Sequence, residues 1–439
     1  MKVMKFGGTS VGKPERMKQV SELITADNEA KIVVLSALSG TTNALVAIGN
    51  RLSEGDKAGA KQLIDELEDH YRIFIEQLVK SEPQKEKASA IVTEHFEFLN
   101  IILRISFSEA LNKDILAQGE LLSTKLFCVF LEELGINHAW LPALDFMVID
   151  EHNEPAMKVI SERLKSILSK HSGQKLFVTQ GYICRNARGE VDNLKRGGSD
   201  YSASLIAAAV QAKVCEIWTD ISGMHNNDPR EVSKTIPIEQ LSFDEAAELA
   251  YFGAKILHPA SIWPAQQANI PVKLLNTMEP SAAGTTISGK ASQKGPRAIA
   301  AKDGITAINI RSSRMLLAYG FLRKIFEVFE YYRTPIDMIT TSEVAVSVTI
   351  DNNQNLPAIL EALKKLGSVE SEEGLSIISI VGSELLQRPN VLRELFSSLD
   401  EVPMRMISYG GSKHNVSVLV SSTDKKKTLE LLNNGLFKL

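Results

Sequence analysis

The stretch Lys2-Val-Met-Lys-Phe6, followed at once by Gly7-Gly-Thr-Ser10, decides the fold prediction. The first five residues, three apolar and two lysines, predict a short strand, and the two glycines after them predict a turn. A helix is expected to begin near Pro14, and Lys31 to Leu35 predicts a second strand. Strands that alternate with helices favour an α/β fold with a mainly parallel sheet covered by helices.

Length and composition limit the number of domains and the class of protein. The chain has 439 residues, of which 44% are hydrophobic and 23% charged, and its formal net charge is -4. Two or three domains are expected at this length. The composition is that of an ordinary globular protein, and the nearly balanced charge does not indicate a polyanionic partner such as nucleic acid.

The cysteines and the N-terminus indicate the compartment. Cys128, Cys184 and Cys215 are widely spaced and form no CxxC pair, which predicts buried reduced thiols. No run of about eighteen apolar residues occurs, and no apolar secretory signal precedes the first strand. We therefore expect a cytoplasmic protein without a membrane partner.

A helical stretch interrupts the alternation of strands and helices. Apolar residues recur three or four apart, as at Leu67, Tyr71 and Phe74, and predict a helical insertion at about residues 54–110. Between residues 278 and 296, small and polar residues replace the apolar periodicity. This shift predicts that the large domain ends at about residue 290 and that a connector follows.

The last third of the chain contains an internal repeat. Phe321-Leu-Arg-Lys-Ile-Phe326 is echoed about seventy residues later by Val391-Leu-Arg-Glu-Leu-Phe396, and Pro335-Ile-Asp-Met-Ile339 by Pro403-Met-Arg-Met-Ile407. Each copy then reaches a strand in which valine and isoleucine alternate with other residues. Two small α+β modules of like design are expected, with coincidence between short apolar helices as the alternative.

The glycines after the first strand nearly spell a P-loop. Gly7, four residues, Gly12 and Lys13 match, but Pro14 stands where that pattern needs a hydroxyl for magnesium. Because Pro14 suits the first turn of a helix, we reject the P-loop. What remains is Lys5 before a glycine turn whose N–H groups suit phosphate oxygens. An ordinary turn beside a solvated lysine is the alternative.

Three further segments have the density of polar residues that phosphoryl transfer needs, since this reaction depends on positioning and charge neutralisation. They are Ser36-Ala-Leu-Ser-Gly-Thr-Thr-Asn43, Gln118-Gly-Glu-Leu-Leu-Ser123 and Lys195-Arg-Gly-Gly-Ser-Asp-Tyr201. Ser199 and Asp200 either contribute to a phosphate site at a helix N-terminus or simply cap that helix. Glu120 either pairs with a cationic group in a cleft or lies on the surface.

Downstream segments add candidates for nucleotide binding. Trp218-Thr-Asp-Ile-Ser-Gly223 and Asp228-Pro-Arg230 predict turns that carry a carboxylate and a guanidinium, with ordinary turns as the alternative. In Tyr251-Phe-Gly-Ala-Lys-Ile-Leu-His-Pro259, Lys255 lies between apolar neighbours, and His258 is expected to be a structural cap. No ligand spacing predicts a protein metal site, so magnesium is expected to arrive with the nucleotide.

Together these motifs resemble the aspartate kinase family. The matching segments are Lys5-Phe-Gly-Gly-Thr-Ser10, Val34-Leu-Ser-Ala37, Gly119-Glu120, Arg196-Gly-Gly-Ser-Asp-Tyr201, Trp218-Thr-Asp220, Asp228-Pro-Arg230 and Phe252-Gly-Ala-Lys-Ile-Leu-His-Pro259. Ile339-Thr-Thr-Ser-Glu-Val344, Glu373-Gly374 and Ser408-Tyr-Gly410 are similar to the paired ACT domains of lysine-sensitive monofunctional members. The resemblance implies a three-layer α/β/α amino-acid-kinase domain at residues 1–290 and two ferredoxin-like ACT domains at 300–439.

The resemblance also implies the reaction and its residues. The γ-phosphate of ATP would pass to the β-carboxylate of L-aspartate, giving 4-phospho-L-aspartate in the first step of lysine, threonine and methionine biosynthesis. The implied catalytic residues are Lys5, which neutralises the phosphoryl group, and Asp200, which organises the charges. The implied aspartate-binding residues are Ser36, Thr42, Glu120, Arg196 and Ser199, with Glu120 facing the ammonium and Arg196 a carboxylate. The implied nucleotide-binding residues are Lys5, Gly7, Gly8, Thr9, Ser10, Thr219, Asp220, His225, Arg230, Lys255 and Ile256.

Two positions depart from the family pattern: His225 stands where relatives often have Tyr, and Lys195 where a Gly often precedes the Arg. No histidine base is required, because the attacking carboxylate is already ionised.

The tail is expected to sense an amino acid, L-lysine by resemblance. The residues implied for the effector are Met315, Gly320, Phe321, Leu322, Asp337, Ser342 and Glu343. Asp337 or Glu343 would meet its ammonium, although both are also ordinary surface residues of such a module. The ACT domains are expected to join subunits into a homodimer or homotetramer, through which the effector shifts activity.

Other classes of protein remain as alternatives. A glutamate or acetylglutamate kinase suits the large domain, but not the paired repeat or the surroundings of Glu120. A catalytically silent amino-acid sensor is disfavoured because Lys5, Arg196 and Asp200 occur together. A fusion with homoserine dehydrogenase is not expected, since no GxGxxG motif follows the repeat.

Overall fold

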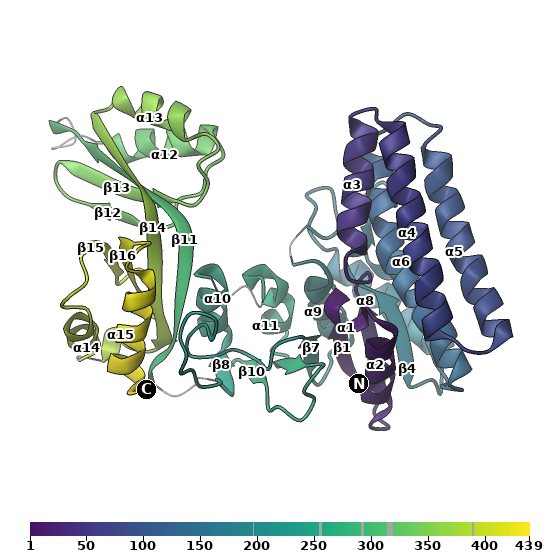
Figure 1. The fold of residues 1–439 in the computed structure, drawn as a ribbon. Coiled ribbons are helices and arrows are strands. Elements are labelled where there is room, and N and C mark those ends of the chain that lie inside the picture. The colour runs from purple at the N-terminus through teal and green to yellow at the C-terminus, as the bar shows by residue number, and fades with distance from the viewer. Residues whose placement is uncertain (196, 254–256, 291–293, 314–318, 389) are drawn as a thin grey trace. The chain divides into compact units, whose positions relative to one another are not determined.

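The computed structural model describes residues 1–195, 197–253, 257–290, 294–313, 319–388 and 390–439. The chain divides into two compact units (Figure 1). The first comprises residues 1–224 and 257–289, and the second comprises residues 225–256 and 290–439. Residues 225–256 therefore pack with the C-terminal third of the chain.

The first unit is built on a mainly parallel sheet with the strand order β3-β4-β2-β1-β7-β9-β10. The strands are β1 (Lys2–Phe6), β2 (Lys31–Leu35), β3 (Ala139–Leu141), β4 (Leu176–Gln180), β7 (Cys215–Thr219), β9 (Val272–Asn276) and β10 (Thr285–Ser288). The strands predicted at residues 2–6 and 31–35 are confirmed with the same bounds. Two short strands, β5 (Ile183–Arg185) and β6 (Val191–Asn193), form a separate hairpin.

The register of β1 brings the ends of its neighbours together. Phe6 is opposite Leu35 on one side and Trp218 on the other, and all these pairings are parallel. The segments that follow these three residues therefore leave the sheet at one edge, where ligands bind in such folds.

Helices cover this sheet and extend beyond it (Figure 1). They are α1 (Gly8–Val11), α2 (Pro14–Thr25), α3 (Thr41–Ser53), α4 (Lys57–Leu78), α5 (Glu82–Ile102), α6 (Glu109–Glu133), α7 (Ala143–Phe146), α8 (Met157–Lys170), α9 (Gly198–Val210) and α11 (Trp263–Gln267), with a 3-10 turn at Pro259–Ser261. The helical character predicted for about residues 54–110 is confirmed by α4 and α5. Tyr71 and Phe96, both fully buried, join these helices to the core beneath β1 and β2.

Two local predictions differ from the structure. The turn expected at Gly7 to Ser10 is a one-turn helix, α1, because the Ser10 N–H donates to the Gly7 carbonyl and winds the chain. The connector expected from residue 278 to 296 contains β10, whose Thr285 pairs antiparallel with Leu274 of β9. Small and polar residues can occupy a strand when a neighbouring strand supplies its hydrogen bonds.

The second unit contains an antiparallel sheet with the order β12-β13-β11-β14-β16-β15. Its strands are β11 (Gly295–Arg311), β12 (Ile339–Thr341), β13 (Ala345–Ile350), β14 (Ser368–Ser383), β15 (Met404–Tyr409) and β16 (Asn415–Ser421). Its helices are α10 (Phe243–Tyr251), α12 (Phe321–Tyr331), α13 (Leu356–Lys364), α14 (Val391–Ser398) and α15 (Lys425–Phe437); a short strand β8 (Gln240–Ser242) and a 3-10 turn (Leu385–Gln387) complete it.

Two lobes share the long strands β11 and β14 (Figure 1). In the first lobe, β13 pairs with residues 306–311 of β11, and α12 and α13 cover the core. In the second lobe, β16 pairs with residues 375–381 of β14, and α14 and α15 pack on a core that includes Ile299 from the beginning of β11. The internal repeat is confirmed, but the lobes are interlocked rather than consecutive, because each long strand passes through both.

Other sequence predictions can be compared directly with the structure. All three cysteines are buried and unpaired, as predicted. His258 caps the 3-10 turn, since its Nδ1 accepts a hydrogen bond from the Ala260 N–H at 3.2 Å. Among the described residues, no helix is both long enough and apolar enough to cross a membrane.

Candidate active site

Lys5 and Asp200 form an ion pair at the edge where β1 and α9 meet. Lys5 Nζ lies 2.6 Å from Asp200 Oδ1, and both side chains are largely but not completely shielded from solvent. Lys5 comes from the end of β1, whereas Asp200 is in the first turn of α9, after Gly197 in a left-handed conformation. An acid at a helix N-terminus is favoured by the helix dipole. The pair therefore holds the lysine ammonium at the N-terminal end of α9.

The glycine segment after β1 packs against the loops after β2 and β7. The Gly7 N–H donates to the Trp218 carbonyl at 3.3 Å. A Cβ at Gly8 would lie 3.0 Å from the Ala37 carbonyl oxygen, and one at Gly12 would lie 2.6 Å from Ser39 Cβ. Side chains at these positions would force the loops apart, so glycine is used here for close approach.

Thr9 and Ser10 take part in the same packing. The Arg16 guanidinium donates to the Thr9 carbonyl. Ser10 is fully buried, and its hydroxyl shares a 2.7 Å hydrogen bond with the Thr277 hydroxyl just after β9. Ser10 thus fixes α1 against the end of β9, which makes its hydroxyl a structural contact in this structure.

Ser36 and Ser199 connect the loop after β2 to α9. Ser36 Oγ donates to Ser199 Oγ at 2.9 Å, and the Ser123 hydroxyl of α6 donates to the Ser36 carbonyl at 2.7 Å. Gly181, directly after β4, permits this approach, because a Cβ there would come within 2.3 Å of Ser199 Cβ. Ser199 lies next to Asp200, so the hydroxyl pair is continuous with the Lys5–Asp200 ion pair.

Glu120 is a buried carboxylate without a cationic partner among the described residues. Its side chain lies within α6 and the residue is only 4% exposed, so the surface alternative is wrong. Oε1 accepts a 3.3 Å hydrogen bond from the Ala37 N–H, and Oε2 is buried with no hydrogen-bond partner among the residues that the structure describes. Burial raises the pKa of Glu120 to about 8. A buried acid of this kind favours a ligand that brings a positive charge.

The two other aspartate-binding candidates have different outcomes. Thr42 is exposed in the first turn of α3, whereas its neighbour Thr41 is buried and shares a 3.0 Å hydrogen bond with the Tyr71 hydroxyl. Arg196 lies outside the described residues. The structure therefore brings together Lys5, Ser36, Glu120, Ser199 and Asp200, and leaves Thr42 open to solvent at the start of its helix.

The nucleotide candidates of the first unit lie at the end of β7. Thr219 is partly buried, Asp220 is exposed, and the Thr219 hydroxyl donates to Asp220 Oδ1 at 3.1 Å. The Thr277 N–H donates to the Thr219 carbonyl at 2.8 Å, which ties this turn to the end of β9. The Asp220 carboxylate is accessible for a ribose or a hydrated cation.

The remaining nucleotide candidates belong to the second unit or are not described. His225 Nδ1 is 2.9 Å from the Thr235 hydroxyl, and burial lowers the pKa of His225. The Arg230 guanidinium is exposed and contacts both oxygens of Asp228, with the shortest distance 2.7 Å. Lys255 and Ile256 lie outside the described residues.

The effector candidates surround the first lobe of the second unit. Gly320 has a φ of 77° and caps α12, where Phe321 is buried and Leu322 is 37% exposed. The Asp337 side chain is only 1% exposed and lies 2.6 Å from Lys302 Nζ, so Asp337 is not an ordinary surface residue. Ser342 and Glu343 are exposed in the turn between β12 and β13, and Met315 is outside the described residues.

Sequence reasoning missed several residues of these sites. Gly181 directly follows β4, and ligands bind beyond the ends of strands in such folds, so its position after a strand was the available signal. Thr277 follows β9, a strand that the sequence pattern did not predict. Lys302 lies within the long strand β11, where no local motif marks it as a site residue. Tertiary contacts alone identify the last two.

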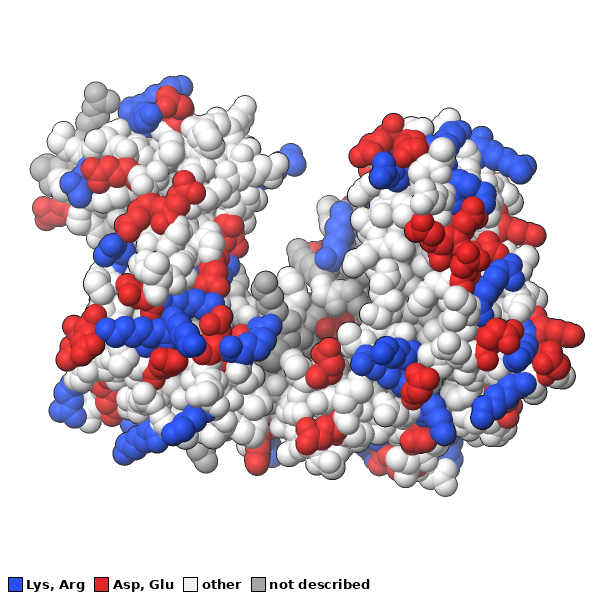
Figure 2. Space-filling view, in the orientation of Figure 1, with Lys and Arg blue, Asp and Glu red and all other residues white. Residues whose placement is uncertain are grey.

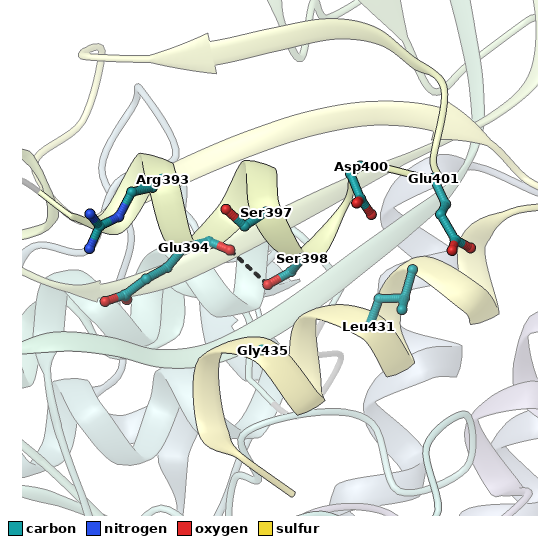
Figure 3. A pocket seen from close by; sticks show the side chains of 8 residues that line it. All are labelled: Arg393, Glu394, Ser397, Ser398, Asp400, Glu401, Leu431 and Gly435. Carbon is teal, nitrogen blue, oxygen red and sulfur yellow. Dashed lines mark hydrogen bonds between the residues drawn. The ribbon is translucent and has the colours of Figure 1, made fainter.

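A hollow of about 460 Å³ lies on the second lobe between α14 and α15 (Figure 3). The Ser398 hydroxyl at its wall donates to the Glu394 carbonyl at 2.7 Å. Two of its carboxylates are in ion pairs, Glu394 with Arg388 and Glu401 with Lys427. Since this neutralises most of its charge, we assign no ligand to the hollow.

Charged side chains of both signs are interspersed on the face shown in Figure 2. No large area of that face carries basic side chains alone. Among the described residues, no group of three or more His, Cys, Asp or Glu side chains is placed to hold a metal ion.

Comparisons with known proteins agree with this architecture. The model of the amino acid kinase family matches residues 1–276, and an ACT domain model matches residues 378–436. The chain is 34% identical to the lysine-sensitive aspartokinase 3 of Escherichia coli over 99% of both chains. It is also 34% identical to the chloroplastic aspartokinase 3 of Arabidopsis thaliana, over 99% of this chain and 81% of that protein.

Solved structures give the same relationship. A crystal structure of E. coli aspartokinase III in complex with aspartate and ADP superposes with a TM-score of 0.84 at 33% identity and covers 100% of both chains. The Clostridium acetobutylicum aspartate kinase gives a TM-score of 0.86 at 25% identity, over 99% of this chain and 100% of that one. The chain therefore belongs to the amino acid kinase family and, within it, to the aspartokinases.

Proposed function

We propose that the protein transfers the γ-phosphoryl group of ATP to the β-carboxylate of L-aspartate, giving 4-phospho-L-aspartate and ADP. One observation carries the proposal: an unbroken series of contacts runs from Glu120 through Ala37 and Ser36 to Ser199 and Asp200, and so to Lys5. This series supports the proposal, because the Glu120 carboxylate could meet a substrate ammonium and the Lys5 ammonium could meet a phosphoryl group. A small amino acid that is phosphorylated on a carboxylate needs a negative group to bind its ammonium and a positive group to stabilise the transferring phosphoryl group.

The proposed role of each residue follows from the charge of its side chain. Glu120 binds the α-ammonium of aspartate, and Ser36, Thr42, Arg196 and Ser199 orient its carboxylates. An oxygen of the β-carboxylate then attacks the γ-phosphorus, a P–O bond forms, and the bond to the β-phosphate oxygen breaks with its electrons leaving on ADP. No proton transfer is needed, because the nucleophile is ionised at neutral pH.

Lys5 stabilises the negative charge that spreads over the transferring group. In the structure its ammonium is paired with Asp200, so Asp200 holds it in place before the nucleotide binds. A positioned cation in a shielded site is among the strongest contributions to such a transfer. A Cβ built on Gly7 would lie 3.4 Å from Lys5 Nζ, so the glycine segment begins next to the ammonium. Thr219 and Asp220 stand at and just after the end of the adjacent strand β7.

The nucleotide is expected as its magnesium complex. Asp200 and Asp220 are the carboxylates of the described site that suit a hydrated Mg²⁺, which keeps most of its waters in phosphate complexes. His225, Arg230, Lys255 and Ile256 complete the proposed nucleotide set. The ion would neutralise phosphate charge, while the residues above bind and orient the substrates.

Regulation is proposed to reside in the two lobes, within a regulatory region at residues 300–439 that follows a catalytic domain at 1–290. L-lysine is the proposed effector, at Met315, Gly320, Phe321, Leu322, Asp337, Ser342 and Glu343. The E. coli relative is named lysine-sensitive, and one of its crystal structures contains lysine and aspartate. That structure superposes with a TM-score of 0.84 over 100% of this chain.

We further propose a homodimer or homotetramer formed through the lobes. Ile339 and Ile407, on the edge strands β12 and β15, are 39% and 38% exposed, and Tyr409 is 41% exposed. Edge strands with exposed apolar side chains are suited to pair with another chain. The cytoplasm is the proposed location, where the three buried thiols would stay reduced.

The decisive experiment measures ATP-dependent acyl phosphate, trapped with hydroxylamine. L-aspartate, L-glutamate and N-acetyl-L-glutamate are compared as acceptors, each with and without L-lysine or L-threonine. Turnover confined to L-aspartate and suppressed by L-lysine is the expected result. A folded protein that binds lysine yet phosphorylates none of the three would be a silent sensor, and the proposed function would be wrong.

A further inference from the structure

Helix α4 of the helical insertion contacts the segment after β2 through Tyr71. Tyr71 is fully buried, and its hydroxyl shares a 3.0 Å hydrogen bond with the hydroxyl of Thr41, which is 1% exposed. The Tyr71 ring also packs against Phe96 of α5, with the ring centres 5.9 Å apart. Side chains from both insertion helices therefore fix the position of the hydroxyl that meets Thr41.

Thr41 packs against α6 next to Glu120. A Cβ built on Gly119 would lie 2.8 Å from Ala37 Cβ and 3.4 Å from Thr41 Cγ2. Because Gly119 has no side chain, the segment from Ala37 to Thr41 can lie directly on the helix turn that carries Glu120. The Ala37 N–H at the beginning of this segment donates to Glu120 Oε1 at 3.3 Å. Residues 37 and 41 thus hold the two ends of one segment against residues 119 and 120.

The same segment continues directly into Thr42, a proposed aspartate contact. Gly40 has a φ of 86°, in the left-handed region, and the Thr41 N–H donates to the Leu38 carbonyl at 3.0 Å. Thr41 is buried whereas Thr42 is exposed, since successive residues of a helix point about 100° apart. A fixed Thr41 side chain therefore fixes the direction in which Thr42 points.

The Tyr71 hydroxyl also lies within electrostatic reach of Glu120. Burial raises the pKa of the Tyr71 hydroxyl, and the negative charge of Glu120 raises it further. The hydrogen bond between Tyr71 and Thr41 uses one of their two hydroxyl protons, so the pair keeps a second O–H that can orient toward negative charge. The hydroxyl pair is therefore placed both to hold the segment and to stabilise a charged Glu120.

We propose that Tyr71 and Thr41 are positioning residues for aspartate recognition, which makes the helical insertion part of the substrate site. Their hydrogen bond holds residues 37–42 on α6, and this segment presents Thr42 and orients Glu120. Without the bond the segment is less ordered, and aspartate must order it on binding, which lowers the affinity. The loss falls on aspartate because the segment carries its proposed contacts. The inference rests on the proposed binding of the aspartate ammonium by Glu120.

The test uses Tyr71→Phe, Thr41→Val and their double variant in the full chain. Thr41→Ser keeps the hydroxyl, whereas Thr41→Val keeps the methyl group and loses the hydroxyl. Tyr331→Phe and Thr25→Val are the matched controls at exposed positions. Calorimetry measures aspartate affinity, steady-state rates give kcat and the KM for aspartate and for ATP, and hydrogen exchange measures the protection of the Ala37 amide. Thermal unfolding shows that each variant is folded.

Tyr71→Phe and Thr41→Val are each expected to weaken aspartate binding and to raise KM for aspartate by about 3- to 10-fold, as the loss of one buried hydrogen bond does. The KM for ATP and kcat should stay close to their wild-type values. The double variant should bind aspartate no more weakly than either single variant, because both changes remove the same bond. Thr41→Ser should keep the wild-type affinity. The Ala37 amide should exchange faster in Tyr71→Phe than in wild type, without any ligand.

Three results overturn the inference. They are additive losses in the double variant, a loss in Thr41→Ser but not in Thr41→Val, and equal rises in both KM values. Unchanged aspartate affinity together with unchanged exchange at Ala37 in Tyr71→Phe also overturns it. A wild type that phosphorylates no aspartate overturns the proposed function instead, while exchange at Ala37 still shows whether Tyr71 holds the segment against Glu120.

Discussion

The two units place their proposed functional residues in opposite ways. In the first unit, β1, β2, β4 and β7 are parallel; the end of β1 supplies Lys5, and the segments after β2, β4 and β7 supply Ser36, Gly181 and Asp220. In the second unit every pair in the large sheet is antiparallel, and β11 and β14 belong to both lobes. A parallel sheet brings side chains from distant segments together at one edge. Strands that belong to two lobes can instead transmit a structural change from one lobe to the other. The first arrangement suits chemistry and the second suits regulation.

The largest expected effect tests the chemical half of this comparison. Lys5→Ala should lower kcat for aspartate phosphorylation by about 10²–10³-fold, the usual result of removing a group that stabilises transition-state charge. Lys13→Ala is the matched control, because Lys13 is exposed and follows the rejected P-loop pattern. Hydroxylamine trapping gives both rates. Equal rates for wild type and Lys5→Ala would remove Lys5 from the mechanism.

Glu120 gives the next largest effect, at the aspartate end of the site. Glu120→Gln should lower kcat/KM for aspartate by about 10–150-fold, because hydrogen bonds to charged groups contribute about 1.5–3 kcal/mol. KM for ATP should be unchanged. Glu97→Gln on the exposed face of α5 is the control. A drop that appeared in KM for ATP would instead place Glu120 at the nucleotide.

The same carboxyl predicts a dependence on pH. The folded pKa is about 8, and the unfolded value is about 4.3. Between these values the folded protein holds a proton that the unfolded chain has lost, so the contribution of Glu120 to stability falls as pH rises from 4.3 to 8. The melting temperature of Glu120→Gln minus that of wild type should therefore increase with pH across this window. Aspartate affinity of wild type should rise toward pH 8, as the carboxyl ionises.

Gly181 tests whether the edge of the parallel sheet requires close contact. Gly181→Ala should destabilise the first unit by about 1–3 kcal/mol, as expected of overpacking, because its Cβ would overlap Ser199. Aspartate turnover should fall with it, since Ser199 is next to Asp200. Gly411→Ala, where no atom lies within 4 Å, is the control in denaturant titrations. A fully active and stable Gly181→Ala would mean that α9 is free to move.

The smallest effect tests the shared strands of the second unit. Ile378→Val in β14 should cost about 0.5–1.5 kcal/mol, the usual range for this change in a core. Because β14 passes through both lobes, hydrogen exchange should accelerate in α12 of the first lobe as well as in α14 of the second. Ile236→Val, at a position 45% exposed, is the control. Acceleration confined to the second lobe would show that the lobes unfold independently.

Much of the first unit could be predicted, because short stretches of neighbouring residues determine its first strands and the turn between them. The pattern at residues 2–6 and 31–35 fixes two strands, and the glycines between them mark the edge where the site forms. The burial of Glu120 could not be predicted from the sequence. A glutamate in an apolar helix is buried only if its face of the helix packs on the sheet, and the sequence does not show which face does so. Thr277 and Lys302 were missed for a related reason: their partners, Ser10 and Asp337, are remote in sequence.

The sequence by itself determined the first two strands, the helices α4 and α5, the repeat and the residue types of a phosphoryl-transfer site, because hydrophobic periodicity and glycine placement act over a few residues. Only the tertiary structure decided that the lobes interlock through β11 and β14, and that residues 225–256 pack with them. It also decided that the Tyr71 hydroxyl meets the Thr41 hydroxyl. These features arise from pairing between segments far apart in the chain, and the stability of such pairing depends on packing that no local pattern records.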